Sequence, residues 1–150
     1  MNKIRLVILS LLLLSITNLA LAQNTPEEMT GNFFNIFEKS PDKAIEYIFG
    51  TNKYLTENLE NIKNLQIQLQ DFIGQVGAYH RYEKITEKSV GANLKLVSFR
   101  LRYDRQPMRI TLIFYRPLDK WTLFNFKYDD SLDDELKEAA KAYRLRDVWD

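Results

Sequence analysis

The stretch VSFRLRYDRQPMRITLIFY, residues 97–115, decides the fold of this chain. Apolar side chains occupy every second position on both sides of the turn-rich segment DRQP, residues 104–107. A period of two is typical of a β-strand with one buried face, and Asp and Pro favour a turn between two such runs. With a two-residue loop, Tyr103 lies opposite Met108 and every further apolar residue meets another. The stretch therefore predicts an antiparallel hairpin.

The flanking residues extend this hairpin into a four-stranded antiparallel sheet. Strand patterns joined as a meander are expected at residues 78–88, 92–103, 107–116 and 120–128. The last of these is apolar on both faces, and Leu94 and Leu96 lie on the face opposite to Val97. A sheet with one wet face does not show this pattern. We therefore expect the sheet either to curl and be covered on both sides or to meet a partner through its outer face.

Three helices are expected before the sheet. Thr25, Pro26 and Glu28 form the start signal of the first helix, with a capping box and a proline in the first turn. The motif SPD at residues 40–42 repeats this signal for the second, and the third is expected from residue 51 or 52 to Gly77. The apolar residues of the third helix recur in steps of three and four, and they form one stripe of Leu55, Leu59, Ile62, Leu65, Leu69, Phe72, Ile73 and Val76.

A further helix is expected after the sheet, beginning at Asp130 or Ser131. The acidic residues 133–135 in its first turn suit the helix dipole. Its inner stripe is expected to consist of Leu132, Leu136, Ala139, Ala140 and Tyr143. Because no linker or repeat separates these elements, residues 23–150 are expected to form one domain.

Residues 1–22 have the layout of a secretory signal peptide. Lys3 and Arg5 precede an apolar run at residues 6–14, and the small residues of the motif ALA at 20–22 suit cleavage before Gln23. The apolar run is short for a membrane span of about 20 residues, which disfavours a retained membrane anchor. We therefore expect an exported protein, periplasmic or secreted, with no stable membrane span after cleavage.

The composition excludes several classes of function. The chain of 150 residues has no cysteine and one histidine, which excludes disulfide scaffolds, thiolate metal sites and a three-histidine zinc site. The five glycines do not have the spacing of a dinucleotide-binding or phosphate-binding loop. The net charge of +1 becomes −1 without residues 1–22, which argues against a nucleic-acid partner. No cofactor and no metal ion are expected.

His80 is the one side chain that ordinarily titrates near neutral pH. If the first two strands pair across residues 90–91, His80 lies opposite Leu101 on the face that covers the helices, beside Tyr82. A histidine beside tyrosines could act as a general base, so His80 is the candidate catalytic residue. The alternative is a histidine packed at the edge of the core with one hydrogen bond satisfied. No serine or cysteine nucleophile is tied to it by spacing, and the sequence favours the alternative.

Four arginines are expected on the opposite face of the sheet. In the same register Arg102 lies opposite Arg109, and Arg81 lies opposite Arg100. Like charges directly opposed destabilise a sheet unless an anion, an acidic partner or a salt-bridged subunit offsets them. Alternatively, the glutamates of the first strand relieve the repulsion on a solvated face. This arginine face is therefore a candidate for anion or partner binding.

The order of these elements resembles the NTF2-like, cystatin-related α+β cone, in which a curved sheet wraps a long helix. The segments that carry the resemblance are residues 33–37, 41–49 and 55–76 and the strands that end in KWTLFNF, residues 120–126. The resemblance implies three N-terminal helices packed on a curved four-stranded antiparallel sheet, with a pocket between sheet and helices. The helix after Tyr128 is an addition to the usual core. The inward positions near this pocket, and so the candidate ligand-binding residues, are His80, Tyr82, Tyr103 and Met108.

Three functions are compatible with these features. The first is an exported, non-catalytic domain that binds a small apolar ligand in the cone, or a protein partner. The second is an NTF2-like lyase, isomerase or hydrolase with His80 as base and Tyr82 or Tyr103 as hydrogen-bond donor. The third is a structural module that forms a homodimer through the outer sheet face, near Phe124 or Phe126, whose orientation depends on the last turn. The sequence favours the first, because no carboxylate is paired with the histidine at the expected inward positions.

Overall fold

The computed structural model describes residues 25–146 of the chain, with side chains up to residue 142. The predicted signal peptide lies outside the described residues. In chain order the elements are α2 (Pro26–Phe37), α3 (Pro41–Phe49), α4 (Lys53–Thr56), α5 (Leu59–Val76), β1 (Tyr79–Val90), β2 (Leu94–Tyr103), β3 (Met108–Tyr115), β4 (Thr122–Asp129) and α6 (Leu132–Arg146). The described part of the chain is therefore an α+β fold with five helices and an open, four-stranded antiparallel sheet.

The sheet has the predicted meander topology, with the strands in the order β1-β2-β3-β4. The register of the central hairpin differs from the prediction by two residues, because Leu101 rather than Tyr103 lies opposite Met108. The connecting loop is wide because its backbone is bound elsewhere: the N–H of Arg105 donates to the carbonyl of Val76 at 3.0 Å. A shift of two keeps every side chain on its predicted face, so the apolar residues of β2 and β3 still share one side of the sheet.

The edge strand β4 contains an irregularity between the partners of Ile113 and Phe114. A bulge inserts one residue into a strand, so the alternation of faces fails beyond it. Phe126 faces the helices, with its ring centre 6.1 Å from that of Phe33. Phe124, at the bulge, is instead 56% exposed. The structure thus separates the two phenylalanines, whose orientation the sequence left open.

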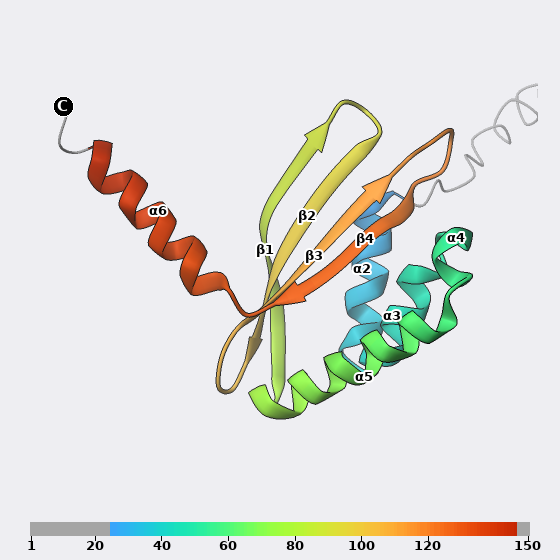
Figure 1. Ribbon diagram of the computed structural model, residues 1–150, viewed down its shortest axis with the longest axis horizontal. Helices are drawn as coiled ribbons and strands as arrows, with labels where there is room; N and C mark the ends of the chain where they lie inside the picture. Colours follow the sequence, from blue (N-terminus) through green and yellow to red (C-terminus); the bar gives the residue numbers. More distant parts are fainter. Residues whose placement is uncertain (1–24, 147–150) are drawn as a thin grey trace, which may run out of the picture.

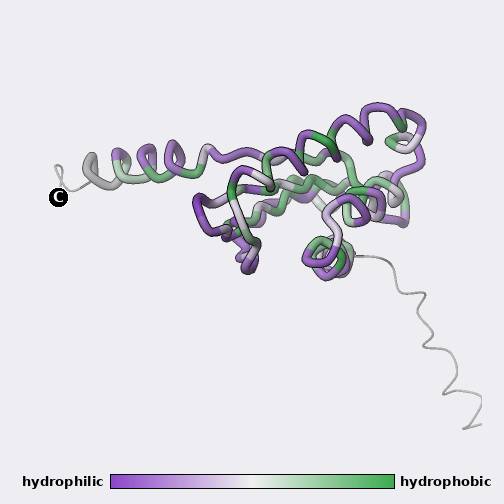
Figure 2. Tube along the Cα trace, turned by 90° about the horizontal axis from the view of Figure 1, so that it is seen from below, coloured by the Kyte–Doolittle hydropathy of each residue, from purple (hydrophilic) through white to green (hydrophobic). Residues whose placement is uncertain are grey.

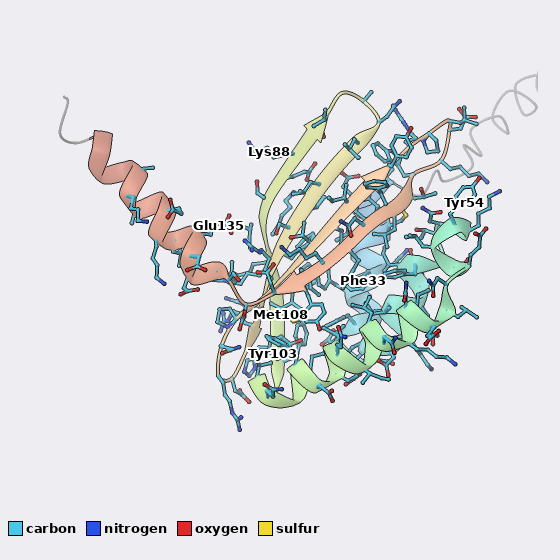
Figure 3. The ribbon with its side chains drawn as sticks, in the orientation of Figure 1. Phe33, Tyr54, Lys88, Tyr103, Met108 and Glu135 are labelled. Atoms are coloured by element: carbon cyan, nitrogen blue, oxygen red, sulfur yellow. The ribbon has the colours of Figure 1, made fainter. Side chains whose placement is uncertain are left out.

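The core lies between one face of the sheet and the helices α2, α3 and α5. Figure 1 shows these helices gathered on the β4 side of the sheet, and Figure 3 shows Phe33 between α2 and the strands. Aromatic rings make up much of this core, and Phe34 packs edge-on against Phe99 with 4.8 Å between ring centres. The largest fully buried side chains are those of Phe33, Phe34, Phe37, Phe114, Met29, Ile45, Ile48, Leu69, Leu101, Met108, Ile110 and Leu112.

The helix start signals read from the sequence are confirmed for α2 and α3. The hydroxyl of Thr25 accepts from the N–H of Glu28 at 3.2 Å, and the Glu28 carboxylate accepts from the N–H of Thr25 at 3.0 Å, which completes a capping box. The side chain of Ser40 likewise accepts from the N–H of Lys43 and caps α3.

The long third helix is two helices, so residues 25–78 contain four helices instead of the predicted three. The side chain of Asn58 accepts from the N–H of Asn61 at 3.2 Å and starts α5 there, after the single turn of α4. Leu59 consequently falls in the first turn of α5 and is exposed rather than part of a buried stripe.

The helix after the sheet begins as predicted, but its expected inner stripe is not covered. Figures 1 and 2 show α6 pointing away from the sheet and from the other helices. Leu136 is 71% exposed, and Ala139 and Ala140 are exposed as well. The prediction of a packed stripe is therefore wrong for these three residues, because α6 projects from the domain instead of folding back on it.

Candidate functional site

Of the predicted inward residues, Tyr103 and Met108 are buried in the core, and Tyr82 packs at its edge, where it is 39% exposed. Met108 is fully buried, and the ring of Tyr82 stacks on that of Phe34 with 3.8 Å between centres. Among four hollows formed by described residues, Tyr103 lines one, of about 430 Å³, beside the loop after β2, whereas Tyr82, Met108 and His80 line none of the four. The rings of Tyr82 and Tyr103 are therefore packed on other aromatic rings, those of Phe34 and Tyr79, and the expected residues do not form a common pocket.

Tyr103 differs from its neighbours because its hydroxyl is buried without a hydrogen-bond partner among the described residues. Burial raises the pKa of Tyr103 above its ordinary value, and burial raises the pKa of Tyr79 beside it to about 12. The two rings meet edge to face with 5.6 Å between centres. Both phenols therefore remain protonated at neutral pH and act as core residues.

His80 does not lie opposite Leu101 on the helix-facing side, which corrects the predicted register of β1. The irregularity between Tyr79 and Arg81 places His80 at a bulge, and Tyr82 pairs with Leu101 instead. The extra residue turns the imidazole to the edge of the sheet, where it is half-exposed.

At this edge His80 is bonded to a carboxylate that the sequence analysis did not connect with it. Nε2 of His80 lies 2.7 Å from Oδ1 of Asp104, and Oδ2 of Asp104 accepts from the N–H of Ala78 at 2.8 Å. The bond from Ala78, and next the bond from His80, lower the pKa of Asp104. A histidine oriented by a carboxylate is half of a nucleophile-activating arrangement. Both side chains are half-exposed, and neither lines any of the four hollows, so the pair serves to tie the loop after β2 to the start of β1.

The arginine face exists, but its pairs differ from the prediction and acidic residues of the chain itself offset them. Arg81 lies opposite Arg102, and Arg100 lies between Glu83 on β1 and Arg109 on β3. The carboxylate of Glu83 forms an ion pair with Arg81 at 3.0 Å and accepts a hydrogen bond from Arg100. The bond from Arg100 lowers the pKa of Glu83. Two differences in register cause the change of partners. The β2–β3 pairing is two residues from the prediction, and β1 and β2 pair from Val90 and Leu94 instead of directly across residues 90–91, with two bulges in β1 beyond that turn.

Arg109, the fourth arginine of this face, is also paired within the chain. Its guanidinium lies 2.8 Å from Asp129 and 2.5 Å from Glu135, in the first turn of α6. The expected repulsion is therefore relieved by acidic side chains of the chain, but of the first-strand glutamates only Glu83 contributes, since Glu87 pairs with Lys84 and Lys95. Arg102 is the member of the four for which the structure shows no acidic partner among the described residues.

The largest of the four hollows lies elsewhere, between α4 and the turn that joins β3 to β4. This hollow, which we call the hairpin groove, has a volume of about 860 Å³. Its apolar lining consists of Tyr54, Leu55, Tyr115, Pro117, Leu118 and Phe124. Tyr54 is 70% exposed on α4 (Figure 3), and Phe124 is the residue that the β4 bulge turns outward.

Two polar side chains hold the walls of the hairpin groove together. The N–H of Leu123 donates to the hydroxyl of Thr51 at 3.0 Å, and the amide of Asn52 donates to the carbonyl of Leu123 at 2.7 Å. These bonds attach the segment before α4 to the free edge of β4. The groove is therefore positioned by both strand and helix, and its rigid base presents the aromatic side chains of its two walls.

Charged residues lie at the rim of the hairpin groove. Lys53, Lys120 and Asp119 contribute to its lining, so the rim has an excess of positive charge. The ammonium of Lys53 lies 4.9 Å from the centre of the Tyr54 ring, within the range of a cation–π contact. A second hollow of about 300 Å³ shares Tyr54 and Phe124 and extends the apolar surface along β4 toward α5.

The hairpin groove could not be identified from the sequence. The aromatic residues on both faces of the last strand were the available signal, and they were interpreted as a covered sheet or a partner surface. Phe124 and Tyr54 are far apart in the sequence, and only the bonds of Thr51 and Asn52 to β4 bring them together.

The described part of the chain contains no group of three or more His, Asp or Glu side chains arranged to hold a metal ion. Of the helices between residues 25 and 146, none combines the length and the apolar character needed to cross a membrane. Comparisons of the chain with protein-family models, with curated proteins and with solved structures found no match.

Proposed function

We propose that this protein is an exported, non-catalytic binding domain of the NTF2-like type, and that the hairpin groove is its binding site. The ligand is a small amphipathic molecule with an apolar body and an acidic group. One observation carries the proposal: three aromatic side chains, Tyr54, Tyr115 and Phe124, converge on a hollow of about 860 Å³ while remaining exposed. Exposed apolar side chains that gather in a hollow are typical of binding sites, whose volumes are about 300–1,000 Å³.

The structure favours recognition by side chains over the addition of a strand to the sheet. At β4, the outward N–H and carbonyl of Leu123 are already bonded to Thr51 and Asn52. At β1, the other edge, two irregularities and a series of charged side chains disfavour pairing with another strand. An extended peptide bound through its backbone is therefore a poorer ligand than a compact apolar one.

The charge of the rim supports an acidic group on the ligand. Lys53 and Lys120 line the groove opposite a single carboxylate, that of Asp119. A ligand carboxylate or sulfonate next to these ammonium groups would be attracted by their positive potential. Neither lysine would have to give up a buried partner.

The alternative of an enzyme that uses His80 receives less support. His80 is bonded to Asp104 at the sheet edge, and neither residue lines the hairpin groove or the other three hollows. A general base must lie within hydrogen-bond reach of a bound substrate. The non-catalytic interpretation is therefore the one we adopt.

Two fluorescent probes of different charge test the binding site. The anionic probe is anilinonaphthalene sulfonate and the neutral probe is Nile red. We expect saturable binding of both, and we expect Phe124→Ala and Tyr54→Ala each to weaken both probes about tenfold, since a buried aromatic contact contributes about 1.5–3 kcal/mol. Lys120→Glu is expected to weaken the anionic probe alone.

Ile67→Ala is the matched control, because Ile67 is a 60% exposed apolar residue of α5 that does not line the groove. Circular dichroism of every variant checks that the fold is intact. Unchanged affinity of Phe124→Ala and Tyr54→Ala for both probes would show that the groove is not the site. If Lys120→Glu weakened both probes equally, the acidic group of the ligand would be rejected while the apolar site remained.

Export is proposed from residues 1–22 and is tested separately. The basic start, the apolar run and the small residues at 20–22 support cleavage before Gln23. Expression of the full chain, followed by cell fractionation and N-terminal sequencing, is expected to yield soluble protein that begins at Gln23. A protein that keeps Met1 and sediments with membranes would instead indicate a retained anchor.

A further inference from the structure

α6 combines a fixed first turn with an uncovered apolar stripe. The carboxylate of Glu135 bonds Arg109 of β3 at 2.5 Å, and Asp129 accepts from the N–H of Ser131 at 3.1 Å, so the direction in which the helix leaves the sheet is set. Beyond this point Leu136 is 71% exposed, and Figures 1 and 2 show the helix extending away from the domain. The helix is thus held out from the sheet rather than packed on it.

A helix of this length has little stability of its own and gains from a partner. α6 has 15 residues, and isolated helices shorter than about 12–15 residues are marginal in water. Its internal ion pairs, such as Lys137 with Asp133 at 2.8 Å, each contribute only about 0.2–0.5 kcal/mol. Most helical stability in proteins comes from packing an apolar face, and this face of α6 is open.

The open stripe borders a hollow on the outer side of the sheet. Leu132, Leu136 and Ala139 of α6 line this hollow of about 460 Å³ together with Ile85, which the second bulge of β1 turns outward. The apolar surface of α6 therefore continues onto the sheet. A partner that covers the stripe also covers Ile85.

The charges of α6 indicate what that partner is. The sequence of the helix begins with Asp133, Asp134 and Glu135 and ends with Arg144 and Arg146. Arg144 follows Asp133, and Arg146 follows Glu135, by about three helical turns, so each acidic position shares a side of the helix with a basic one. Two copies of this helix that pack antiparallel bring the acidic start of each against the basic end of the other.

We propose that two copies of this chain form a dimer in which their α6 helices pack antiparallel through the stripe of Leu132, Leu136, Ala139 and Ala140. Because a two-fold axis relates the copies, the stripe of one copy packs against the same stripe of the other. The small side chains of Ala139 and Ala140 allow the two helices to approach closely at the axis. Asp133 of each copy then lies beside Arg144 of the second copy. A lipid surface fits less well, because the acidic start of α6 is unlike the basic polar face of membrane-bound helices.

The oligomeric state of the full chain, purified after expression with its own N-terminal segment, tests the dimer. Analytical ultracentrifugation is expected to show a monomer–dimer equilibrium, and Leu136→Glu is expected to raise its dissociation constant at least about tenfold. Ile67→Glu, a charge placed at a similarly exposed apolar residue of α5, is expected to leave the equilibrium unchanged. Hydrogen exchange of the α6 backbone is expected to slow as protein concentration rises.

Charge reversal tests the antiparallel arrangement. Asp133→Arg alone and Arg144→Asp alone are each expected to weaken the dimer. The two-fold axis repeats the contact between positions 133 and 144, so each change places like charges opposite each other at both contacts. An equimolar mixture of these two variants is expected to associate as the unaltered chain does, since both contacts between copies are then restored. Lys141→Glu changes a charge that helical spacing puts on the side of α6 opposite the stripe, and it is expected to have no effect.

Three results would overturn the proposal. The first is a protein that remains a monomer up to about 1 mM, as expected if α6 binds its own sheet or an unlike protein. The second is a dimer that Leu136→Glu leaves intact, which would place the contact on another surface. The third is a mixture of the two charge-reversed chains that associates no better than either alone.

Discussion

α5 and α6 are two amphipathic helices that flank the same sheet, and they differ in whether their apolar side is covered. α5 buries Ile62, Leu69 and Val76 in the core. The apolar residue Leu136 of α6 is 71% exposed. Both stripes follow from the same spacing of three and four residues. Helical spacing therefore identifies an apolar side but does not tell whether the domain itself covers it.

The ends of the two helices explain this difference. The last residues of α5 are attached to the loop after β2, because Arg105 donates to the carbonyls of Gln75 and Val76 at 2.8 and 3.0 Å. Among the side chains that the structure describes, up to residue 142, α6 is attached at its start, through the ion pair of Arg109 with Glu135. α5 is held against the core at its last residues and buries its apolar stripe, whereas α6 is held at its first turn and leaves its stripe exposed.

The largest expected effect comes from the stripe of α5. Leu69 is fully buried, so Leu69→Ala removes apolar contacts and leaves a cavity. We expect this change to lower the free energy of unfolding by about 2–5 kcal/mol. Urea denaturation followed by circular dichroism measures it. A loss below about 1 kcal/mol would mean that α5 is packed less tightly than the structure shows.

The junction that follows α5 is expected to be the next most sensitive point. Gly77 has a φ of +92°, and a Cβ at this position would lie 2.9 Å from the side chain of Asp104. Gly77→Ala is therefore expected to cost about 1–3 kcal/mol, because the backbone is strained and the His80-bonded carboxylate must move. Gly74→Ala is the control, because a Cβ there meets nothing within 4 Å and alanine favours the helix. Equal unfolding midpoints for the two variants would contradict the prediction that an alanine at position 77 is strained.

Much of the fold could be predicted from the sequence. The meander, the position of each strand within a few residues, the capping box at Thr25 and the separate helix after Asp130 all follow from local patterns. The sequence did not reveal the three strand irregularities, because a bulge adds one residue without a distinctive composition. It also did not reveal the break before Asn58, since the apolar spacing of the third helix continues across it.

The candidate site could be predicted far less well. His80 and its arginine neighbours were placed by a register that assumed tighter turns and an unbroken β1. The wider turns on both sides of β2 and the two irregularities of β1 changed their partners. The hairpin groove depends on contacts between segments remote in sequence, such as Asn52 with Leu123. No local periodicity contains such information, whereas the buried side of β3 does follow from alternation alone.

A smaller effect is expected from the charge of Asp104, and it depends on pH. The pKa of Asp104 in the folded protein is below the ordinary aspartate value of 3.8, first through the bond from Ala78 and then through His80. A lowered pKa stabilises the fold at pH values above 3.8, and this contribution is lost as the pH falls through the lowered value. Asp104→Asn keeps an oxygen acceptor for Ala78 and removes the charge. Its urea midpoint should lie below that of the unaltered protein at neutral pH, and the gap should close in acid. A gap that stays constant with pH would show that the charge is not what stabilises the junction.

The smallest expected effect comes from Leu136→Ala, the counterpart in α6 of Leu69→Ala in α5. At protein concentrations where the chain is a monomer, we expect the free energy of unfolding to change by no more than about 0.5 kcal/mol, because the side chain loses no buried contacts. At concentrations where two copies associate, dimerisation stabilises the unaltered chain by mass action. The variant loses this added stability. The difference between the two unfolding midpoints should therefore grow with protein concentration. A large loss already in the monomer would instead place α6 against its own sheet, and the contrast between the two helices would disappear.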